Sequence, residues 1–155
     1  MMKTNAIRIL ASLEIHHVIH EYDVSDGLID GVSVARKIGR EPERVFKTLV
    51  TAGKSTGINV FVIPVECELD LKKAALAAGD KCVEMIKSRE LEPQTGYVHG
   101  GCSPIAMKKS FPTFIEETAL LQEAIVVSAG RVGLQMELSP GDLARVTGAA
   151  FCDLV

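Results

Sequence analysis

The sequence predicts a single α+β domain over residues 1–155, built from a mixed, curled or partly closed barrel-like β-sheet that is flanked by helices. Two observations support this prediction. Several short strand patterns, some alternating and some apolar throughout, are interleaved with three or four helix patterns. The chain of 155 residues is near the usual size of one domain, and no repeat, low-complexity tract or linker divides it.

The helix patterns are bounded by residue types that favour helix ends. Each pattern begins near a side chain that can accept a hydrogen bond from a free backbone amide, and most of the patterns end at a glycine. A further stretch at 88–96 predicts one helical turn. The expected helices follow Thr4 and then span 30–39, 69–79 and 139–148.

The strand patterns are runs of apolar, β-branched and aromatic residues that are bounded by turn residues. The two longest runs are joined by a glycine-containing turn, which predicts a hairpin. These two strands are expected at 44–51 and 58–64. The other expected strands are 17–23, 82–86, 97–101, 113–118, 124–129 and 134–138.

Composition and charge narrow the class of protein. Seventeen basic and twenty acidic residues give a net charge of −3, which disfavours a protein that wraps a nucleic-acid duplex nonspecifically. The apolar runs are far shorter than the roughly 20 residues that a membrane helix needs, and the N-terminus lacks a signal-peptide core. We therefore expect a cytoplasmic protein with no membrane contact. Its four cysteines should be reduced, and their spacing predicts neither a metal nor a cofactor.

One lysine interrupts a strand pattern. In an extended chain Lys47 shares a face with Val45 and Leu49, and neither face of this strand is cleanly polar. Lys47 either runs its stem along a sheet edge to reach water, or stands in a cavity among apolar neighbours. Burying an ammonium group without a partner is costly, so a lysine in a cavity implies an anionic or strongly polar ligand.

A glycine-rich turn lies close in sequence to two lysines. Gly100 and Gly101 allow positive φ and the close approach of another molecule, and Pro104 fixes the turn that follows. Such a segment either is an ordinary turn or directs consecutive N–H groups into a concavity that holds a carbonyl oxygen or a phosphate. Cys102 is expected to be a small apolar filler rather than a nucleophile, because no carboxylate in the pattern orients the nearby His99.

Six segments carry further motifs, and in order they span nearly the whole chain: VFKTLVT, LDLKKAALAAG, VEMI, TGYVHGGCSPIAMKK, SFPTFIEE and IVVSAGRVGLQMELSPGDLARVTGA. Together they resemble the YbaK/EbsC family, whose proteins are similar to the editing domain of bacterial prolyl-tRNA synthetases. The resemblance implies a trans-editing deacylase that hydrolyses the ester of a mischarged tRNA, foremost cysteine on proline tRNA, written Cys-tRNA(Pro). It also implies a mixed barrel-like core with surrounding helices.

The resemblance assigns roles to residues by position. Lys47, Gly100 and Gly101 are the expected catalytic residues, with the glycine backbone holding the aminoacyl carbonyl. The attacking group is then the substrate thiol, water or the ribose 2′-OH. The expected substrate-binding residues are Tyr22, Thr48, Ser103, Pro104 and Ser128. By pattern alone, Tyr22 is equally a half-buried strand residue and Ser128 an ordinary turn residue.

Two positions depart from the family's pattern. Ala106 stands where the family commonly has Gly, and Gln135 stands where the cysteine-specific branch usually has Asp. Two alternatives therefore stay open: a deacylase for alanine or serine on tRNA, and a noncatalytic module that binds an aminoacyl-tRNA or nucleotide end. The expected partners are the aminoacylated 3′ end of tRNA and, through the resemblance, prolyl-tRNA synthetase. The chain is expected to be a monomer or a weak homodimer.

Overall fold

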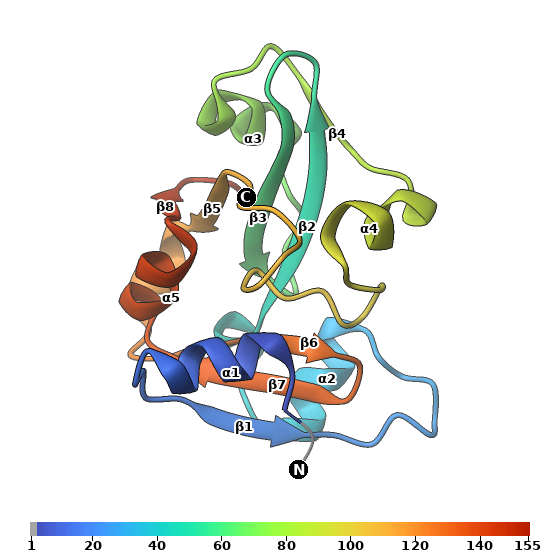
Figure 1. Cartoon of the computed structure of the whole chain (residues 1–155), viewed down its shortest axis with the longest axis vertical. Coiled ribbons are helices and arrows are strands. Elements are labelled where there is room, and N and C mark those ends of the chain that lie inside the picture. The colour runs from blue at the N-terminus through green and yellow to red at the C-terminus, as the bar shows by residue number, and fades with distance from the viewer. Residues whose placement is uncertain (1–2) are drawn as a thin grey trace.

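Two β-sheets form the centre of the molecule, as a computed structural model that describes residues 3–155 shows (Figure 1). The smaller sheet has three antiparallel strands, which lie in the spatial order β1 (Val18–Glu21), β7 (Leu134–Leu138) and β6 (Ile125–Arg131). The larger sheet has five strands, which lie in the spatial order β4 (Val83–Met85), β2 (Phe46–Gly53), β3 (Gly57–Pro64), β5 (Thr113–Glu116) and β8 (Ala150–Cys152).

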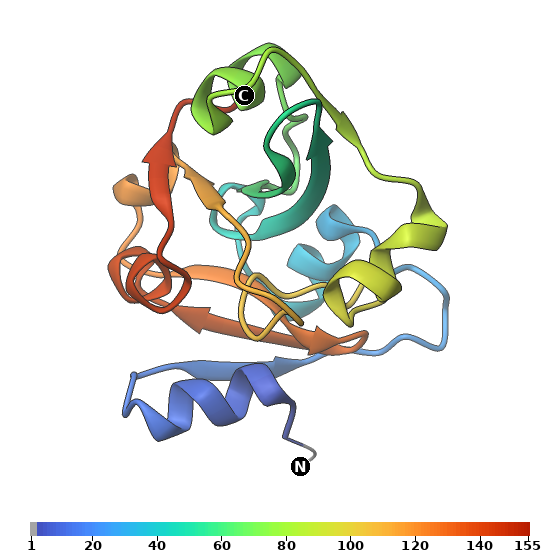
Figure 2. The same cartoon turned by 45° about the horizontal axis from the view of Figure 1, so that its top comes forward.

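The larger sheet is mixed, because β2 pairs antiparallel with β3 and β4, whereas β3 with β5 and β5 with β8 are parallel. The two sheets are joined by a single parallel bridge between Val45 and Val126, and Figure 2 shows the strands of the two sheets running in different directions. The prediction of one α+β domain with a mixed sheet is confirmed. The sheet does not close into a barrel, because closure requires continuous pairing around the whole circumference and one bridge does not supply it.

Five α-helices within residues 3–155 surround the sheets, and four of them begin at the predicted capping residues. The side chains of Thr4, Asp30, Asp70 and Ser139 each accept a hydrogen bond from a backbone amide in the first turn of the helix that follows. The helices are α1 (Asn5–Ser12), α2 (Gly31–Ile38), α3 (Leu71–Ala78), α4 (Ser88–Thr95) and α5 (Pro140–Thr147), with 3₁₀ turns η1 (Pro42–Arg44) and η2 (Glu117–Leu121).

Three sequence-based expectations about secondary structure were wrong. Residues 97–101 form a turn and not a strand, because the Gly101 amide donates to the Val98 carbonyl at 3.0 Å. The stretch that predicted one helical turn is the eight-residue helix α4. The strand β8 was missed, since its three residues are too few to show a pattern and are fixed by parallel pairing with β5.

The apolar core lies on both sheets and at their junction. Helices α1 and α5 pack on the smaller sheet, where Leu10, Met136 and Leu143 are buried in one cluster with residues of the larger sheet. Helix α3 packs on the larger sheet. Helix α2 covers the junction of the two sheets through a third cluster that contains Ala35 and Val126. Among the described residues, no helix is long and apolar enough to cross a bilayer.

Two glycines, one within α5 and one directly after it, provide a matched test of where this helix ends. Gly148 ends the helix at φ +69°, and Gly141 lies within the helix, with no atom near the position that an added Cβ would take at either residue. We expect Gly148→Ala to lower the free energy of unfolding by about 1 kcal/mol, because only glycine adopts that conformation freely. Gly141→Ala should raise it by about 0.5 kcal/mol through helix propensity. Urea unfolding measures both changes. If the two substitutions changed the free energy of unfolding equally and in the same direction, Gly148 would not be the residue that ends α5.

Candidate active site

A cavity of about 190 Å³ opens where α2, the start of β2 and the loop after α4 meet the smaller sheet. Its walls are mainly apolar, which lowers the local dielectric and strengthens any polar contact made inside. Residues with polar side chains reach this wall from several elements. On the strands they are Lys47 and Thr48 of β2, Ser128 of β6 and Gln135 of β7, and Asp30 before α2 and His99 after α4 line it as well.

The position of Lys47 decides between the two interpretations that the strand pattern allowed. Lys47 lies opposite Ile63 in the β2–β3 pair, is half-buried and lines the cavity. Its ammonium group makes no hydrogen bond or ion pair with any residue from 3 to 155. The Asp30 carboxylate, which also belongs to the cavity wall, is engaged with the Ser33 amide as the cap of α2. Lys47 therefore belongs to the cavity wall and carries a charge that no ion pair among the described residues neutralises.

The hydroxyl of Thr48 is a second unpaired group. Thr48 Oγ1 is buried and has no hydrogen-bond partner within the described chain. A buried polar group that is left unpaired costs about 1–3 kcal/mol. A ligand that supplies a hydrogen bond to this hydroxyl would recover that free energy. The side chains of Lys47 and Thr48 leave opposite faces of β2, because successive residues of a strand alternate.

Ser128 and Gln135 form a cross-strand pair that faces the cavity from the smaller sheet. Ser128 Oγ accepts a hydrogen bond from the Gly130 amide at 3.2 Å, so the hydroxyl is already held in place. Gln135 is only 6% exposed, and its side-chain amide makes no hydrogen bond with another described residue. Gln135 can therefore offer either a donor or an acceptor to a small ligand.

The glycine loop meets the cavity through Gly100 and Cys102 and not through Gly101. Gly100 has φ +84°, and an added Cβ there would lie 2.9 Å from Ile29 Cδ1, so the position requires glycine for two reasons. The backbone amides of Gly100 and Cys102 have no partner among residues 3–155. The Gly101 amide is used in the turn with Val98. The two available amides are therefore those on either side of Gly101.

Gly101 has a packing role in this loop. An added Cβ at Gly101 would lie 2.9 Å from the backbone nitrogen of Val132, so the glycine allows the loop to approach the β6–β7 turn closely. Ser103 is completely buried and its hydroxyl accepts from the Ile105 amide at 3.2 Å. Pro104 lines a different depression, next to α1 and α5. The structure does not place Gly101, Ser103 or Pro104 on the cavity wall, although the sequence interpretation grouped them with Gly100.

Tyr22 also lies outside the cavity wall. Its backbone amide donates to the Gly133 carbonyl at 3.0 Å, and its hydroxyl is buried with no described partner. Tyr22 lines a separate depression beside the β6–β7 turn. Of the eight residues singled out from the sequence, the structure brings together Lys47, Thr48, Gly100 and Ser128, and it leaves Tyr22, Gly101, Ser103 and Pro104 apart from them.

Cys102 lies in the cavity wall but is poorly suited to attack a substrate. It is 9% exposed, and burial raises the pKa of its thiol to about 12, although a hydrogen bond with Thr95 acts in the opposite direction. The thiolate, which is the nucleophilic form, is therefore scarce at neutral pH. No group of three His, Cys, Asp or Glu side chains in the described chain could hold a metal ion.

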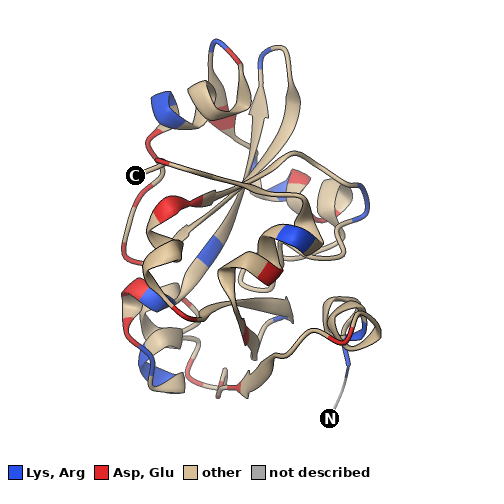
Figure 3. Cartoon of the chain, turned by 90° about the vertical axis from the view of Figure 1, so that its left-hand side faces the viewer, with Lys and Arg blue, Asp and Glu red and all other residues tan. Residues whose placement is uncertain are grey.

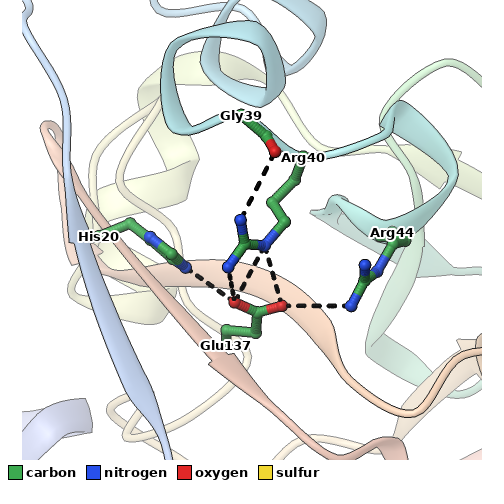
Figure 4. A network of polar contacts seen from close by, with 5 residues as sticks. All are labelled: His20, Gly39, Arg40, Arg44 and Glu137. Carbon is green, nitrogen blue, oxygen red and sulfur yellow. Dashed lines mark hydrogen bonds and ion pairs between the residues drawn. The ribbon is translucent and has the colours of Figure 1, made fainter.

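Behind the cavity, a buried carboxylate fixes the elements that carry it (Figure 4). Glu137 of β7, whose side chain is 8% exposed, lies 2.8 Å from His20 Nε2, 3.0 Å from Arg40 Nη2 and 3.5 Å from Arg44 Nη2. These partners come from β1, from the second residue after α2 and from η1, which leads into β2. Sequence reasoning missed this network, because its side chains come from segments that are far apart in the sequence.

The charge of Glu137 is stabilised by these contacts. Burial alone would raise the pKa of the Glu137 carboxyl, but the hydrogen bonds from Arg40 and His20 outweigh it and hold this pKa below its ordinary value of 4.5. Glu137 lies two residues from Gln135 on the same face of β7, and Arg44 directly precedes Val45 of the cavity wall. The network thereby fixes β7 and the start of β2 relative to each other.

Comparisons with known proteins agree with this architecture. The family model of the aminoacyl-tRNA editing domain matches residues 30–146, which include every polar side chain of the cavity. A protein of Enterococcus faecalis, named as a candidate Cys-tRNA(Pro)/Cys-tRNA(Cys) deacylase, EbsC, is 47% identical over 152 residues, which is 98% of this chain and 93% of that protein.

Solved structures show the same fold. A crystal structure described as a candidate trans-editing enzyme for prolyl tRNA synthetase has a TM-score of 0.83 at 25% identity, with 99% of this chain and 98% of that chain covered. The hypothetical protein APE2540 has a TM-score of 0.85 at 22% identity, covering 95% and 96%. The fold is that of a small editing domain. The chain belongs to the aminoacyl-tRNA editing domain family, which makes it a hydrolase of aminoacyl esters.

Replacing Glu137 tests the network that supports the cavity. We expect Glu137→Gln to lower the free energy of unfolding by about 2 kcal/mol at pH 7, because the charge-assisted hydrogen bonds from Arg40 and the ion pair with Arg44 are lost. Because the pKa of Glu137 is depressed in the folded state, its contribution is present above the ordinary pKa and is lost as the pH falls through the folded value. The difference between the two proteins in urea unfolding should therefore shrink between about pH 5 and pH 3.

The matched control is Glu84→Gln, since Glu84 is exposed on β4 and has no described partner. This control should change the free energy of unfolding by no more than about 0.5 kcal/mol at either pH. If Glu137→Gln behaved like the control, the network would not stabilise the fold.

Proposed function

We propose that the protein removes cysteine from mischarged proline tRNA in trans, by hydrolysing the ester that joins the amino acid to the 3′-terminal ribose. Membership of the editing family supports the class of reaction, and the relative from Enterococcus faecalis supports the substrate. The observation that carries the proposal is the Lys47 ammonium, which stands without a counter-ion in a mainly apolar cavity beside two unpaired loop amides.

The size of the cavity limits what can enter it. Its volume of about 190 Å³ is below the roughly 300–1,000 Å³ of pockets that enclose drug-sized ligands. The aminoacyl group would fill it, while the body of the tRNA stays outside. The Lys47 ammonium would then contact the electron-rich 3′-terminal ribose or phosphate at the mouth. Thr48 Oγ1 would gain a hydrogen-bond partner from the substrate.

The loop amides would stabilise the charge that develops on the aminoacyl carbonyl oxygen. The sequence assigned this role to Gly100 and Gly101, whereas the hydrogen bonding favours Gly100 and Cys102 because the Gly101 amide donates to Val98. Two preorganised N–H donors in a site of low dielectric suit an oxyanion better than a neutral carbonyl, so they lower the barrier. An aminoacyl ester is already activated, and such stabilisation with correct positioning is the main requirement.

The attacking group would come from the substrate, because burial raises the pKa of the Cys102 thiol and the Asp30 carboxylate on the cavity wall serves as the cap of α2. The cysteine thiol attacks its own ester carbonyl, a carbon–sulfur bond forms, and the carbon–oxygen bond to the ribose breaks. The thiol proton passes to the departing ribose oxygen, so that tRNA leaves with a free hydroxyl. Water then opens the resulting cyclic thioester to free cysteine. The protein supplies only positioning and electrostatic stabilisation. The proposed location of the reaction is the cytoplasm, where tRNA is aminoacylated.

Lysine replacement tests this proposal directly. We expect Lys47→Ala to lower kcat/KM on Cys-tRNA(Pro) by at least about 100-fold, the usual effect of removing a charge-stabilising group. Lys54→Ala is the control, because Lys54 lies in the turn between β2 and β3 and does not line the cavity. Deacylation of purified Cys-tRNA(Pro) provides the measurement. Parental activity in the Lys47→Ala protein would remove this lysine from the mechanism.

Gln135 favours a second candidate, deacylation of serine or alanine on proline tRNA. A neutral amide that lacks a partner can hydrogen-bond a serine hydroxyl as well as a thiol. If serine or alanine were removed as fast as cysteine, water and not the substrate thiol would be the attacker. Retention of every aminoacyl ester in single-turnover mixing would favour a noncatalytic binding module. Prolyl-tRNA synthetase is the proposed partner for selecting the tRNA, and a monomer or weak homodimer is the proposed state.

A further inference from the structure

A second depression of the surface lies on the other side of the loop that forms the cavity. It is lined by the N-terminal end of α1 (residues 3–5), the end of α4 and the turn after it (95–97), the loop at 106–108 and the β6–β7 turn (130–131). These four segments are remote in sequence, and Figure 1 shows them around the N-terminal end of α1, below α4. We call this depression the basic groove, because of the residues that line it.

The basic groove is lined by cations and by no carboxylate of the described chain. Its charged residues are Lys3, Lys108 and Arg131, and its remaining lining side chains are uncharged. This segregation is unusual for a chain with a net charge of −3, and the side of the molecule shown in Figure 3 carries basic and acidic residues interspersed. A concave surface with one sign of charge attracts anions and raises their local concentration.

Two of these cations are available to a ligand. Lys3 is exposed and its ammonium makes no hydrogen bond or ion pair with residues 3–155. Lys108 is exposed as well, and Nζ makes only a long contact of 3.3 Å with the carbonyl oxygen of Pro93. Arg131 also lines the groove but has an interaction of its own within the fold.

The basic groove and the cavity share two segments of backbone. The loop from 95 to 102 lines the groove with Thr95–Tyr97 and the cavity with His99, Gly100 and Cys102. Strand β6 likewise lines the cavity with Ser128 and the groove with its last two residues. Tyr97 and Gly100 are three residues apart, a span of at most about 11 Å. A nucleic acid whose tip fills the cavity can therefore bring its following phosphates to the groove.

We propose that the basic groove binds the phosphates of the tRNA strand that ends in the aminoacyl group. This inference rests on the proposed function, which places that end in the cavity. Phosphate contacts by Lys3, Lys108 and Arg131 position a strand without reading its sequence. The groove would thus hold the acceptor end of any tRNA, while the small cavity selects the amino acid. Such a division explains how a chain with a net negative charge can bind a polyanion through a local patch.

A double variant, Lys3→Ala with Lys108→Ala, tests the groove, and Arg131 is left intact because it contacts the fold. The control is Lys54→Ala with Lys81→Ala, which removes the same charge from exposed sites around the β2–β3 hairpin tip. Two measurements are made: binding of uncharged tRNA as a function of salt, and deacylation of Cys-tRNA(Pro) and of a short cysteinyl oligonucleotide that ends in the same three nucleotides.

We expect the groove variant to bind uncharged tRNA at least about 10-fold more weakly than the control, with the slope of log K against log salt reduced by about 1.5, as the loss of two phosphate contacts requires. Its ratio of kcat/KM on tRNA to kcat/KM on the short substrate should fall at least about 10-fold as well. Binding and salt slopes equal to those of the control would overturn the proposal, and so would equal losses on both substrates, which would indicate a structural defect.

The outcome for the groove is separable from the outcome for the proposed function. If the parental protein hydrolysed neither substrate, the editing reaction would be refuted. The uncharged-tRNA measurement would still show whether the groove binds phosphates, because it requires no catalysis. If the parental protein hydrolysed both substrates while the groove variant bound tRNA like the control, the groove inference alone would fail.

Discussion

An uncompensated positive charge in a mainly apolar cavity is the constraint on which the rest of the site depends. A lysine on a central strand costs free energy unless something satisfies its ammonium group, and here no described carboxylate does so. The fold keeps this cost small by leaving Lys47 only half-buried and opening the cavity to solvent. The electrostatic attraction of the Lys47 ammonium for an anion is therefore available to a ligand. An ester at the end of a polyanion is a ligand of suitable charge.

The surrounding elements keep that charge and the loop amides in one place. Strand β2 carries Lys47 and Thr48, and its start is linked to β7 by the contacts of Arg40 and Arg44 with Glu137. The glycine loop is held from the other side, because Gly101 packs on the β6–β7 turn and its amide is bound within the loop. Neither element could shift independently without breaking these contacts. The site is therefore preorganised, as electrostatic stabilisation of a transition state requires.

Much of the fold could be predicted because its signals are local. Capping side chains fix the starts of four helices, and the long runs on either side of a glycine turn identify the β2–β3 hairpin. Strand β8 and the division into two sheets could not be predicted, since they depend on pairing between segments far apart in sequence. The turn at 97–101 has strand-like residues at its start, but the hydrogen bond from Gly101 to Val98 fixes it as a turn.

Some residues of the candidate site could likewise be predicted from the sequence, and others could not. Lys47 and Gly100 were predictable, because a charge in a strand and a glycine in a turn are visible in a single sequence. The separate packing roles of Gly101, Ser103 and Pro104 were not, since neighbours in sequence can face different surfaces. Ala106, at φ +62°, occupies a conformation that suits glycine, so this departure from the family pattern places an alanine in a strained part of the backbone. Glu137 was missed because its burial depends on α2 and η1.

The most direct test of the account is a crystal structure with a non-hydrolysable analogue of 3′-cysteinyl adenosine, in which an amide replaces the ester. The account predicts the aminoacyl group inside the cavity, Lys47 Nζ within about 3 Å of an oxygen of the ribose or its phosphate, and the carbonyl oxygen at a similar distance from the Gly100 and Cys102 amides. An analogue bound elsewhere, with Lys47 directed into bulk solvent, would contradict it.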